Sequence, residues 1–348
     1  RGLRASSVAV HAGNSGTTVR LITGVVAAHP FATRFEGDAS LSRRPMKRIA
    51  EPLTAMGASF EFARSDGLPM TVHGGTLSGI SWNTRAASAQ TKSAILLAGL
   101  SAGVQVTVIE ARKSRDHTER MLTSLGAPVE TDETSVSLSP VESIAPLELS
   151  VPGDPSSAAY FAALGVLGAA KEVTVPGVCV NPTRTGFFDT LKDMGARIEL
   201  TDRSAAAGDA TATVIAKKSR LTDFSVGPSS IPAMIDELPL LACVACAAGV
   251  SLEIRGAEEL RVKESDRIAT VVRNLRSIGA DADELRDGLV VRGRRGRLSG
   301  RVVTEGDHRI AMAFGVLAAI PQNSIDIDDP DCVGVSYPNF WQDLRSLL

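Results

Sequence analysis

Two short stretches in the second half of the sequence combine acidic and basic residues in a way that suits proton transfer. Asp236 and Glu237 stand at the head of the apolar run 238–246, so a carboxylate pair begins a helix that otherwise looks buried. Residues 263–267 read Lys-Glu-Ser-Asp-Arg, which places further acids among cations. Such surroundings separate pKa values, as general acids and bases require. Helix capping by the first pair and a solvated helix start at 263–267 are the simpler alternatives.

Basic side chains accompany several polar loops and favour a local anion site. Guanidinium groups suit carboxylate and phosphate oxygens, although any single one of these cations is more commonly a surface charge or an ion-pair partner. His117 and His308 could carry protons, but a hydrogen-bonded structural histidine is the commoner outcome. The cations beside the loops are Arg20, Arg44, Arg115, Lys263, Arg267 and Arg309.

The loops themselves are short polar segments that lead into apolar helices. Gly, Ser, Thr and Asp at a helix start leave backbone N–H groups pointing outward, where the helix dipole favours an anion. Any one of these loops could be explained as a good N-cap alone. Because five such loops recur at nearly the same spacing, several of the helix starts are expected to converge. The loops are residues 13–18, 88–93, 153–157, 235–237 and 306–309.

A repeat of the form Leu-x-x-apolar-Gly-Ala positions these loops. It begins at residues 53, 122, 191 and 275, and each copy predicts a helix, a left-handed glycine stop and a strand, such as 59–62 or 197–200. A fifth copy at 344–347 lacks its following strand, and the first residue is Arg1 rather than Met. We therefore expect five of six repeat units, with the missing unit before Arg1 and the missing strand supplied by the N-terminal end.

Composition indicates an ordinary globular protein of about two domains. The chain has 348 residues, 44% hydrophobic and 22% charged, and a formal charge of −2, which gives no attraction to nucleic acid. The proline-rich stretch 140–152 predicts the junction, which gives domains 1–148 and 149–348. No long apolar run or leader suggests a membrane span or secretion, so a cytoplasmic location is the default.

Several cofactor and nucleophile patterns are missing from the sequence. It contains no nucleotide-binding glycine motif, no nucleophile elbow and no His/Cys metal cluster, so no cofactor and no metal are expected. The four cysteines, Cys179, Cys243, Cys246 and Cys332, lack ligand spacing and are expected to be buried packing thiols.

Six strings resemble, in order and spacing, the 5-enolpyruvylshikimate-3-phosphate synthase family, the 3-phosphoshikimate 1-carboxyvinyltransferases. One such string would be weak, whereas six in series cover nearly the whole chain. The resemblance implies an α/β (α+β) fold of two similar domains, each built from βαβαββ units as an inside-out α/β barrel, with substrates bound between the domains. The strings are residues 13–20, 41–46, 88–93, 114–122, 261–267 and 306–312.

The resemblance also implies roles for particular residues. Asp236 would be the base toward the acceptor hydroxyl, Glu264 would handle the C3 proton of phosphoenolpyruvate, and Lys263 would complete the catalytic set. Shikimate 3-phosphate would be bound by Ser88, Ala89, Gln90, Arg115, Asp236 and Lys263. Phosphoenolpyruvate would be bound by Gly16, Arg44, Gln90, Arg267 and Arg309.

Two departures from the family pattern concern substrate contacts. The family's N-terminal Lys-Ser-x-x-x-Arg motif would precede Arg1, so the resemblance implies an N-terminally truncated chain. Val335 stands where many members carry a lysine that contacts phosphoenolpyruvate.

The implied reaction transfers the enolpyruvyl group of phosphoenolpyruvate to the 5-hydroxyl of shikimate 3-phosphate. It proceeds by addition and elimination through a tetrahedral intermediate, releases phosphate, and is the sixth step of the shikimate pathway to chorismate and aromatic amino acids. The partners would be these two substrates, with neither nucleic acid nor membrane, and a monomer is the family expectation.

Two alternatives remain beside this reading. One is the sister transferase that acts on UDP-N-acetylglucosamine, which normally carries a reactive cysteine before an Arg-Pro pair; the loop 37–45 has none. The other is an inactive anion-binding fragment of the same fold.

Overall fold

A computed structural model describes residues 3–84, 88–293 and 296–348. The chain divides into two compact units, Arg1–Leu149 (unit 1) and Ser150–Leu348 (unit 2). The boundary expected from the sequence lies between residues 148 and 149. Arg1, on which the expectation of a missing unit partly rests, lies outside the described residues.

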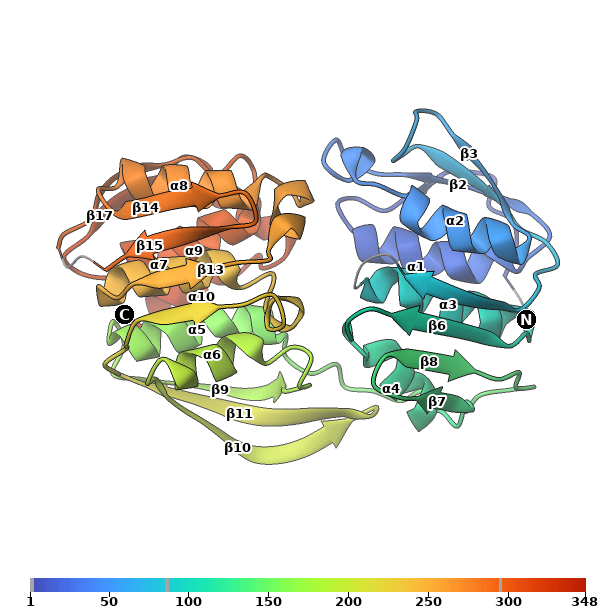
Figure 1. Cartoon of the computed structure of the whole chain (residues 1–348), viewed down its shortest axis with the longest axis horizontal. Coiled ribbons are helices and arrows are strands. Elements are labelled where there is room, and N and C mark those ends of the chain that lie inside the picture. Colours follow the sequence, from blue (N-terminus) through green and yellow to red (C-terminus); the bar gives the residue numbers. More distant parts are fainter. Residues whose placement is uncertain (1–2, 85–87, 294–295) are drawn as a thin grey trace. The chain divides into compact units, whose positions relative to one another are not determined.

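Unit 1 contains two four-stranded sheets with the same topology (Figure 1). In each, two parallel strands are followed by an antiparallel hairpin, which gives the unit βαβαββ. The first comprises β1 (Val10–His11), α1 (Gly16–Ala27), β2 (Ala32–Glu36), η1 (Leu41–Arg43), α2 (Lys47–Met56), β3 (Ser59–Phe62) and β4 (Met70–His73). The second comprises β5 (Ile80–Thr84), α3 (Ala89–Ala102), β6 (Val106–Glu110), α4 (His117–Ser124), β7 (Val129–Thr131) and β8 (Ser135–Leu138).

Unit 2 continues the repeat with three further copies. The third copy has a single parallel bridge, Gly153 to Val178, in place of its first strand, followed by α5 (Pro155–Leu167), β9 (Glu172–Cys179), α6 (Gly186–Asp193), β10 (Arg197–Ala206) and β11 (Asp209–Lys217). The fourth comprises β12 (Phe224–Val226), η2 (Ile231–Ala233), α7 (Leu238–Ala248), β13 (Leu252–Ile254), η3 (Glu258–Val262), α8 (Arg267–Ser277), β14 (Asp281–Leu285) and β15 (Gly288–Arg292). The fifth comprises β16 (Ser299–Val302), α9 (His308–Ala318), β17 (Ser324–Ile327), η4 (Pro330–Val335) and α10 (Phe340–Ser346).

The glycine stops that the repeat predicts are confirmed. Gly57, Gly126, Gly195 and Gly279 follow α2, α4, α6 and α8 with φ values of 124°, 82°, 99° and 92°. A side chain is strained at such angles, so glycine ends each helix at low cost and lets the chain turn into the next strand. The mixed α/β repeat is therefore confirmed, while the sixth unit stays a prediction.

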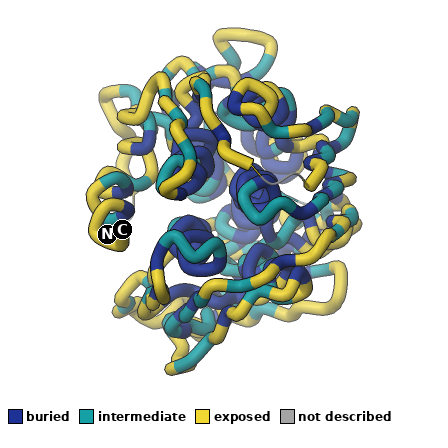
Figure 2. Tube along the Cα trace, turned by 90° about the vertical axis from the view of Figure 1, so that its left-hand side faces the viewer, coloured by how far each residue is buried: buried dark blue, intermediate teal, exposed yellow. Residues whose placement is uncertain are grey.

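The second series of helices forms the centre of each unit. In α7 every residue from Leu238 to Cys246 is buried, which explains why this helix shows no polar face. In unit 1, α1 and α3 approach so closely that a Cβ atom on Gly24 would lie 2.2 Å from the Ala94 carbonyl oxygen. Figure 2 shows buried helical turns enclosed by exposed loops. The polar loops identified in the sequence therefore lead directly into these inner helices.

The remaining structural expectations concern thiols and membranes. Cys179, Cys243 and Cys246 are buried as predicted, but Cys332 is only half-buried, because it lies in the short helix η4 near the surface of unit 2. Within the described part of the chain, no helix is long and apolar enough to cross a bilayer.

Candidate active site

Two adjacent helix starts form the candidate anion site of unit 1. Ser15 caps α1 by accepting the Thr18 N–H at 3.2 Å, and Ser88 caps α3 by accepting the Thr91 N–H at 3.4 Å. Gln90 joins the two starts, since its Nε2 donates to the Thr17 hydroxyl at 2.7 Å. The positive ends of two helix dipoles therefore lie side by side, as an anion site requires.

Two arginines surround these helix starts. Buried Arg20 donates from Nη1 to Gln90 Oε1 at 2.5 Å and from Nη2 to the Pro45 carbonyl at 3.1 Å, which fixes the glutamine amide. A Cβ atom on Gly16 would lie 2.8 Å from Arg20 Nη1, so glycine leaves room for this contact. Arg44 follows η1 and donates from Nη2 to Asn14 Oδ1 at 2.7 Å. The predicted residues Gly16, Arg44 and Gln90 are thus brought together.

Asp66 positions the Arg44 loop and was not singled out from the sequence. Its Oδ1 accepts the N–H groups of Met46 at 2.7 Å, Lys47 at 3.0 Å and Gly67 at 2.7 Å. One carboxylate oxygen therefore caps the start of α2 from a separate loop. A partner twenty residues away leaves no local spacing signal, so only the structure identifies it.

A buried ion-pair cluster connects α3 with the loop that carries Arg115. The Lys92 ammonium lies 2.7 Å from both Glu110 and Glu119, and the Ser114 hydroxyl donates to Glu110 at 2.5 Å. All four of these side chains are buried. Burial raises the pKa of Glu119, although Lys92 opposes the change. Arg115 is half-buried beside this cluster, and its contact with a substrate stays a prediction.

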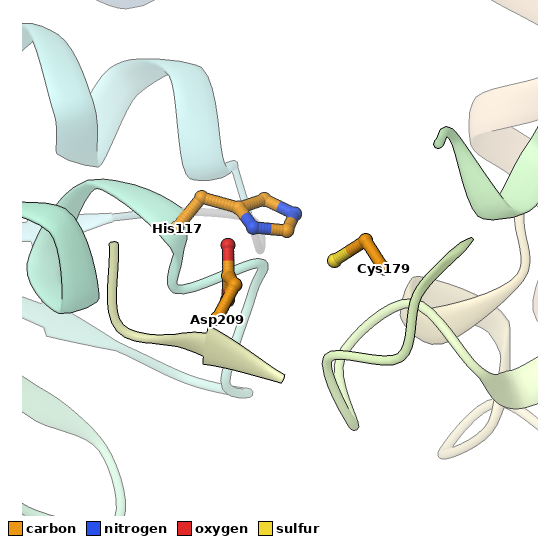
Figure 3. A group of neighbouring side chains, drawn as sticks. All are labelled: His117, Cys179 and Asp209. Carbon is orange, nitrogen blue, oxygen red and sulfur yellow. The ribbon is translucent and has the colours of Figure 1, made fainter. Parts of the chain in front are cut away.

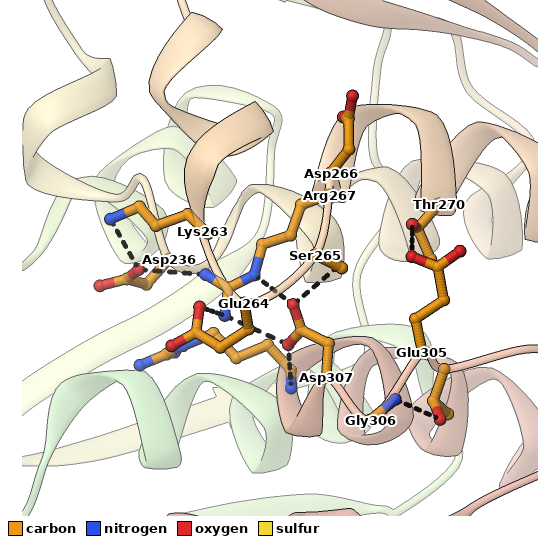
Figure 4. Close-up of polar contacts among 12 residues, drawn as sticks. Asp236, Lys263, Glu264, Ser265, Asp266, Arg267, Thr270, Glu305, Gly306 and Asp307 are labelled. Atoms are coloured by element: carbon orange, nitrogen blue, oxygen red, sulfur yellow. Dashed lines mark hydrogen bonds and ion pairs between the residues drawn. The ribbon is translucent and has the colours of Figure 1, made fainter. Parts of the chain in front are cut away.

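In unit 2, three carboxylates converge on the guanidinium of Arg267 (Figure 4). Its Nε donates to Asp307 Oδ2 at 2.8 Å, its Nη2 to Glu264 Oε2 at 2.7 Å, and its Nη1 to Asp236 Oδ1 at 3.3 Å. Only 1% of the arginine side chain is exposed. The group draws together residues from the starts of α7, α8 and α9, of which the α7 and α9 starts belong to the five loops expected to converge.

Asp236 lies between two cations. Lys263 Nζ is 3.7 Å from the same Oδ1 that accepts from Arg267. Arg309 Nη1 lies 3.7 Å from Glu237 Oε1. Burial tends to lower the pKa of Arg309, but Asp236, Tyr160 and Glu237 more than offset it and raise that pKa. Both arginines therefore stay charged.

The two groups at the start of α9 titrate far from neutral pH. Burial opposes ionisation of Asp307, yet the charge and hydrogen bonds of Arg267 lower its pKa to about 2. Burial and the neighbouring Arg309 lower the pKa of His308 to about 4. His308 is therefore neutral at pH 7, which argues against the hypothesis that it carries a proton as an imidazolium at neutral pH.

The alternative that the Asp236–Glu237 pair simply caps α7 is wrong for Glu237. Glu237 occupies the N-cap position with φ −96° and ψ −6°, which is helical rather than extended. The extended geometry at Ser15, Ser88 and Asp154 lets a side-chain oxygen reach back to the first turn. The two acids instead face the cations of the α8 and α9 starts.

Arg184 is a second residue that the sequence did not reveal. Its Nη2 donates to Asp154 Oδ1 at 2.7 Å and to the Ser156 hydroxyl at 2.9 Å, which holds the start of α5. Nearby in unit 2, the Asn181 amide donates to Asp209 at 2.7 Å, and Figure 3 draws Asp209 with Cys179. Burial raises the pKa of the Cys179 thiol, so it is not a reactive thiolate.

Comparison with known proteins decides the family. The sequence profile of EPSP synthase (3-phosphoshikimate 1-carboxyvinyltransferase) matches residues 2–344. A 3-phosphoshikimate 1-carboxyvinyltransferase of Sulfurihydrogenibium is 45% identical, with 99% of this chain and 81% of the relative covered. The chain belongs to the EPSP synthase family. The namesake protein of Bacillus subtilis is 42% identical over 96% of this chain and 79% of its own length.

Solved structures agree with this assignment. The EPSP synthase of Acinetobacter baumannii superposes with a TM-score of 0.86 at 38% identity, covering 99% of this chain and 80% of that one. The enolpyruvyl transferase NikO of Streptomyces tendae matches with a TM-score of 0.69 at 19% identity, covering 94% of this chain and 74% of that one, which shows a shared fold alone. The family assignment makes the chain a transferase of the 3-phosphoshikimate 1-carboxyvinyltransferase class.

Proposed function

We propose that this protein transfers the enolpyruvyl group of phosphoenolpyruvate to the 5-hydroxyl of shikimate 3-phosphate and releases phosphate. The observation that carries the chemistry is the position of Asp236, whose Oδ1 lies 3.7 Å from Lys263 and 3.3 Å from Arg267. Two cations lie beside this carboxylate, its side chain is 13% exposed, and a carboxylate in this position can accept a proton from a hydroxyl.

The reaction proceeds by addition and elimination. Asp236 accepts the proton of the acceptor hydroxyl as that oxygen attacks C2 of phosphoenolpyruvate, while Glu264 delivers a proton to C3. The resulting tetrahedral ketal then loses phosphate, which takes the proton held by Asp236, as Glu264 recovers a proton from the C3 methyl group. Lys263 and Arg267 stabilise the negative charge that develops on oxygen during both steps. Neither step involves oxidation or reduction, and neither needs a cofactor.

Substrate contacts follow from the two helix-start clusters. In unit 1, the α3 start (Ser88, Ala89 and Gln90) together with Arg115 suits the phosphate of shikimate 3-phosphate, and the α1 start with Gly16 and Arg44 suits phosphoenolpyruvate. In unit 2, Asp236 and Lys263 suit ring hydroxyls, whereas Arg267 and Arg309 suit the carboxylate and phosphate of phosphoenolpyruvate. We further propose that the protein is a cytoplasmic monomer that binds neither nucleic acid nor membranes.

The experiment is a phosphate-release assay with phosphoenolpyruvate and either shikimate 3-phosphate or UDP-N-acetylglucosamine as acceptor. It is run on this chain alone and on this chain supplemented with the part of the Sulfurihydrogenibium relative that the alignment leaves uncovered. We expect phosphate release with shikimate 3-phosphate and none with UDP-N-acetylglucosamine. Asp236→Ala should lower the rate of phosphate release about a hundredfold or more.

The matched control is Asp326→Ala, which removes an aspartate with a 75% exposed side chain from the same unit. We expect it to retain full activity. Release that depends on UDP-N-acetylglucosamine would favour the sister transferase, and no release with either acceptor in either sample would contradict the proposed activity.

A further inference from the structure

The side chain of Arg261 fastens the segment that precedes α8 to a neighbouring hairpin turn. Its Nη1 donates to Asp266 Oδ2 and to Glu284 Oε1, both at 2.8 Å. Its Nε donates to the Arg286 carbonyl at 2.9 Å, and its Nη2 donates to the Leu285 carbonyl at 2.6 Å. One guanidinium therefore connects the loop, the end of β14 and the turn between β14 and β15.

The contact with Asp266 closes a loop. Asp266 is the N-cap of α8, where its Oδ1 accepts the Ala269 N–H at 3.1 Å, so the carboxylate has one oxygen for the helix and one for Arg261. Arg261 is the fourth of the five residues of η3, and its pair with Asp266 spans residues 262–265. Lys263 and Glu264 lie inside this closed loop.

The turn to which Arg261 is fastened is itself held firmly. The Asp287 carbonyl accepts the Ala257 N–H at 2.7 Å, and its Oδ2 accepts the Gly256 N–H at 3.0 Å. A Cβ atom on Gly288 would lie 1.8 Å from the Ile254 carbonyl oxygen, so the hairpin lies directly against the end of β13. The turn is therefore held in place by hydrogen bonds and close packing, and contacts from Arg261 to this turn can fix the position of the loop.

We propose that Arg261 is a positioning residue for the transfer reaction, because it holds Lys263 and Glu264 in register with their partners. This inference rests on the proposed function. The distances that it maintains are 3.7 Å from Lys263 Nζ to Asp236 and 2.7 Å from Glu264 to Arg267. Displacements of about 1 Å at such groups cost about a hundredfold in rate.

Global stability depends little on the same contacts. Arg261 has a 27% exposed side chain, and its partners Asp266 and Glu284 are 38% and 43% exposed. Ion pairs at this exposure contribute little to folding. A substitution at Arg261 should therefore change the loop without unfolding unit 2.

The test compares Arg261→Lys with Arg255→Lys. Lysine keeps the charge but cannot reach two carboxylates and two carbonyls at once. Arg255 is the matched control, since it also bonds the turn, donating to Glu253 at 2.7 Å and Asp287 at 3.5 Å, but lies outside the catalytic loop. We expect Arg261→Lys to lower kcat about a hundredfold while the KM for phosphoenolpyruvate changes less than about threefold. Arg255→Lys should stay within about twofold of the unmodified protein in both constants.

A second readout does not depend on turnover. Exchange of the Ala269 amide, which donates to Asp266 Oδ1 at 3.1 Å, should become at least about tenfold faster in Arg261→Lys and stay unchanged in Arg255→Lys, with equal melting temperatures. Should Arg261→Lys fail to fold, Asp266→Asn keeps the helix cap, weakens the same pair, and is expected to lower kcat about tenfold.

The outcomes separate the two proposals. An unmodified protein without turnover on shikimate 3-phosphate contradicts the proposed function, whereas unchanged exchange in Arg261→Lys contradicts the positioning role by itself. With turnover established, an unaltered kcat in Arg261→Lys, or an equal loss in Arg255→Lys, would overturn the inference.

Discussion

Replacing Asp307 by asparagine should weaken unit 2 in a pH-dependent way. The carboxylate is fully buried and accepts hydrogen bonds from Arg267 at 2.8 and 3.2 Å, from the Ser265 hydroxyl at 3.0 Å and from the Arg309 N–H at 3.0 Å. Asparagine keeps the shape but removes the negative charge that faces a buried guanidinium. Removing one partner of a buried pair typically costs about 3–5 kcal/mol. Because Glu264 and Asp236 remain beside Arg267, we expect the lower end of that range at pH 6.

The pH-dependent part follows from the pKa of Asp307. It lies at about 2 in the folded protein, below the ordinary value of 3.8. At roughly 1.4 kcal/mol for each pH unit, this interval corresponds to about 2 kcal/mol of stability. A lowered carboxyl pKa stabilises the fold fully above pH 3.8, and this contribution is lost as the pH falls through about 2. About 1 kcal/mol of it should already be lost at pH 3.

The assay is urea unfolding at pH 6 and pH 3, followed by the fluorescence of Trp341 in α10. The chain has two tryptophans, so both proteins carry Trp82→Phe to restrict the signal to unit 2. The difference in unfolding free energy between Asp307→Asn and its parent should shrink by about 1 kcal/mol from pH 6 to pH 3. A difference that is equal at both pH values would refute the electrostatic reasoning.

Two further predictions concern unit 1. Lys92→Met should lower the free energy of unfolding by about 3–5 kcal/mol at pH 7, because Glu110 and Glu119 lose their only buried cation among the described residues. Urea titration measures this change, and a loss below about 1 kcal/mol would contradict the prediction. Gly24→Ala should cost about 1–3 kcal/mol, since its Cβ would meet the Ala94 carbonyl at 2.2 Å, whereas Gly75→Ala, with open space around it, should melt close to the unmodified protein.

The repeat could be predicted from sequence because its signals are local. A left-handed glycine after each helix, as at Gly57 and Gly195, acts through its own backbone and its position along the chain. Likewise Ser15 and Ser88 cap helices through N–H groups three residues ahead. Spacing alone therefore locates these elements.

The interior of the candidate site could not be predicted in the same way. Asp307 meets Arg267 across forty residues, and Asp66 meets the start of α2 across twenty. Glu237 has the residue type and position of a cap, yet it faces Arg309 from another repeat. The Arg267 and Glu237 pairings depend on how repeat units pack against one another, and the Asp66 contact depends on how one loop folds back within its unit, so no local spacing encodes them.

Deuterium incorporation during turnover in heavy water tests the central chemical claim most directly. Addition delivers a solvent-derived deuteron to C3 of phosphoenolpyruvate, and elimination removes one hydrogen from the resulting methyl group. We predict that the transferred enolpyruvyl group carries deuterium at its vinyl carbon, and that Asp236→Ala shows neither label nor phosphate release. Product that forms at the normal rate with an unlabelled vinyl group would contradict addition and elimination, and with it the roles assigned to Asp236 and Glu264.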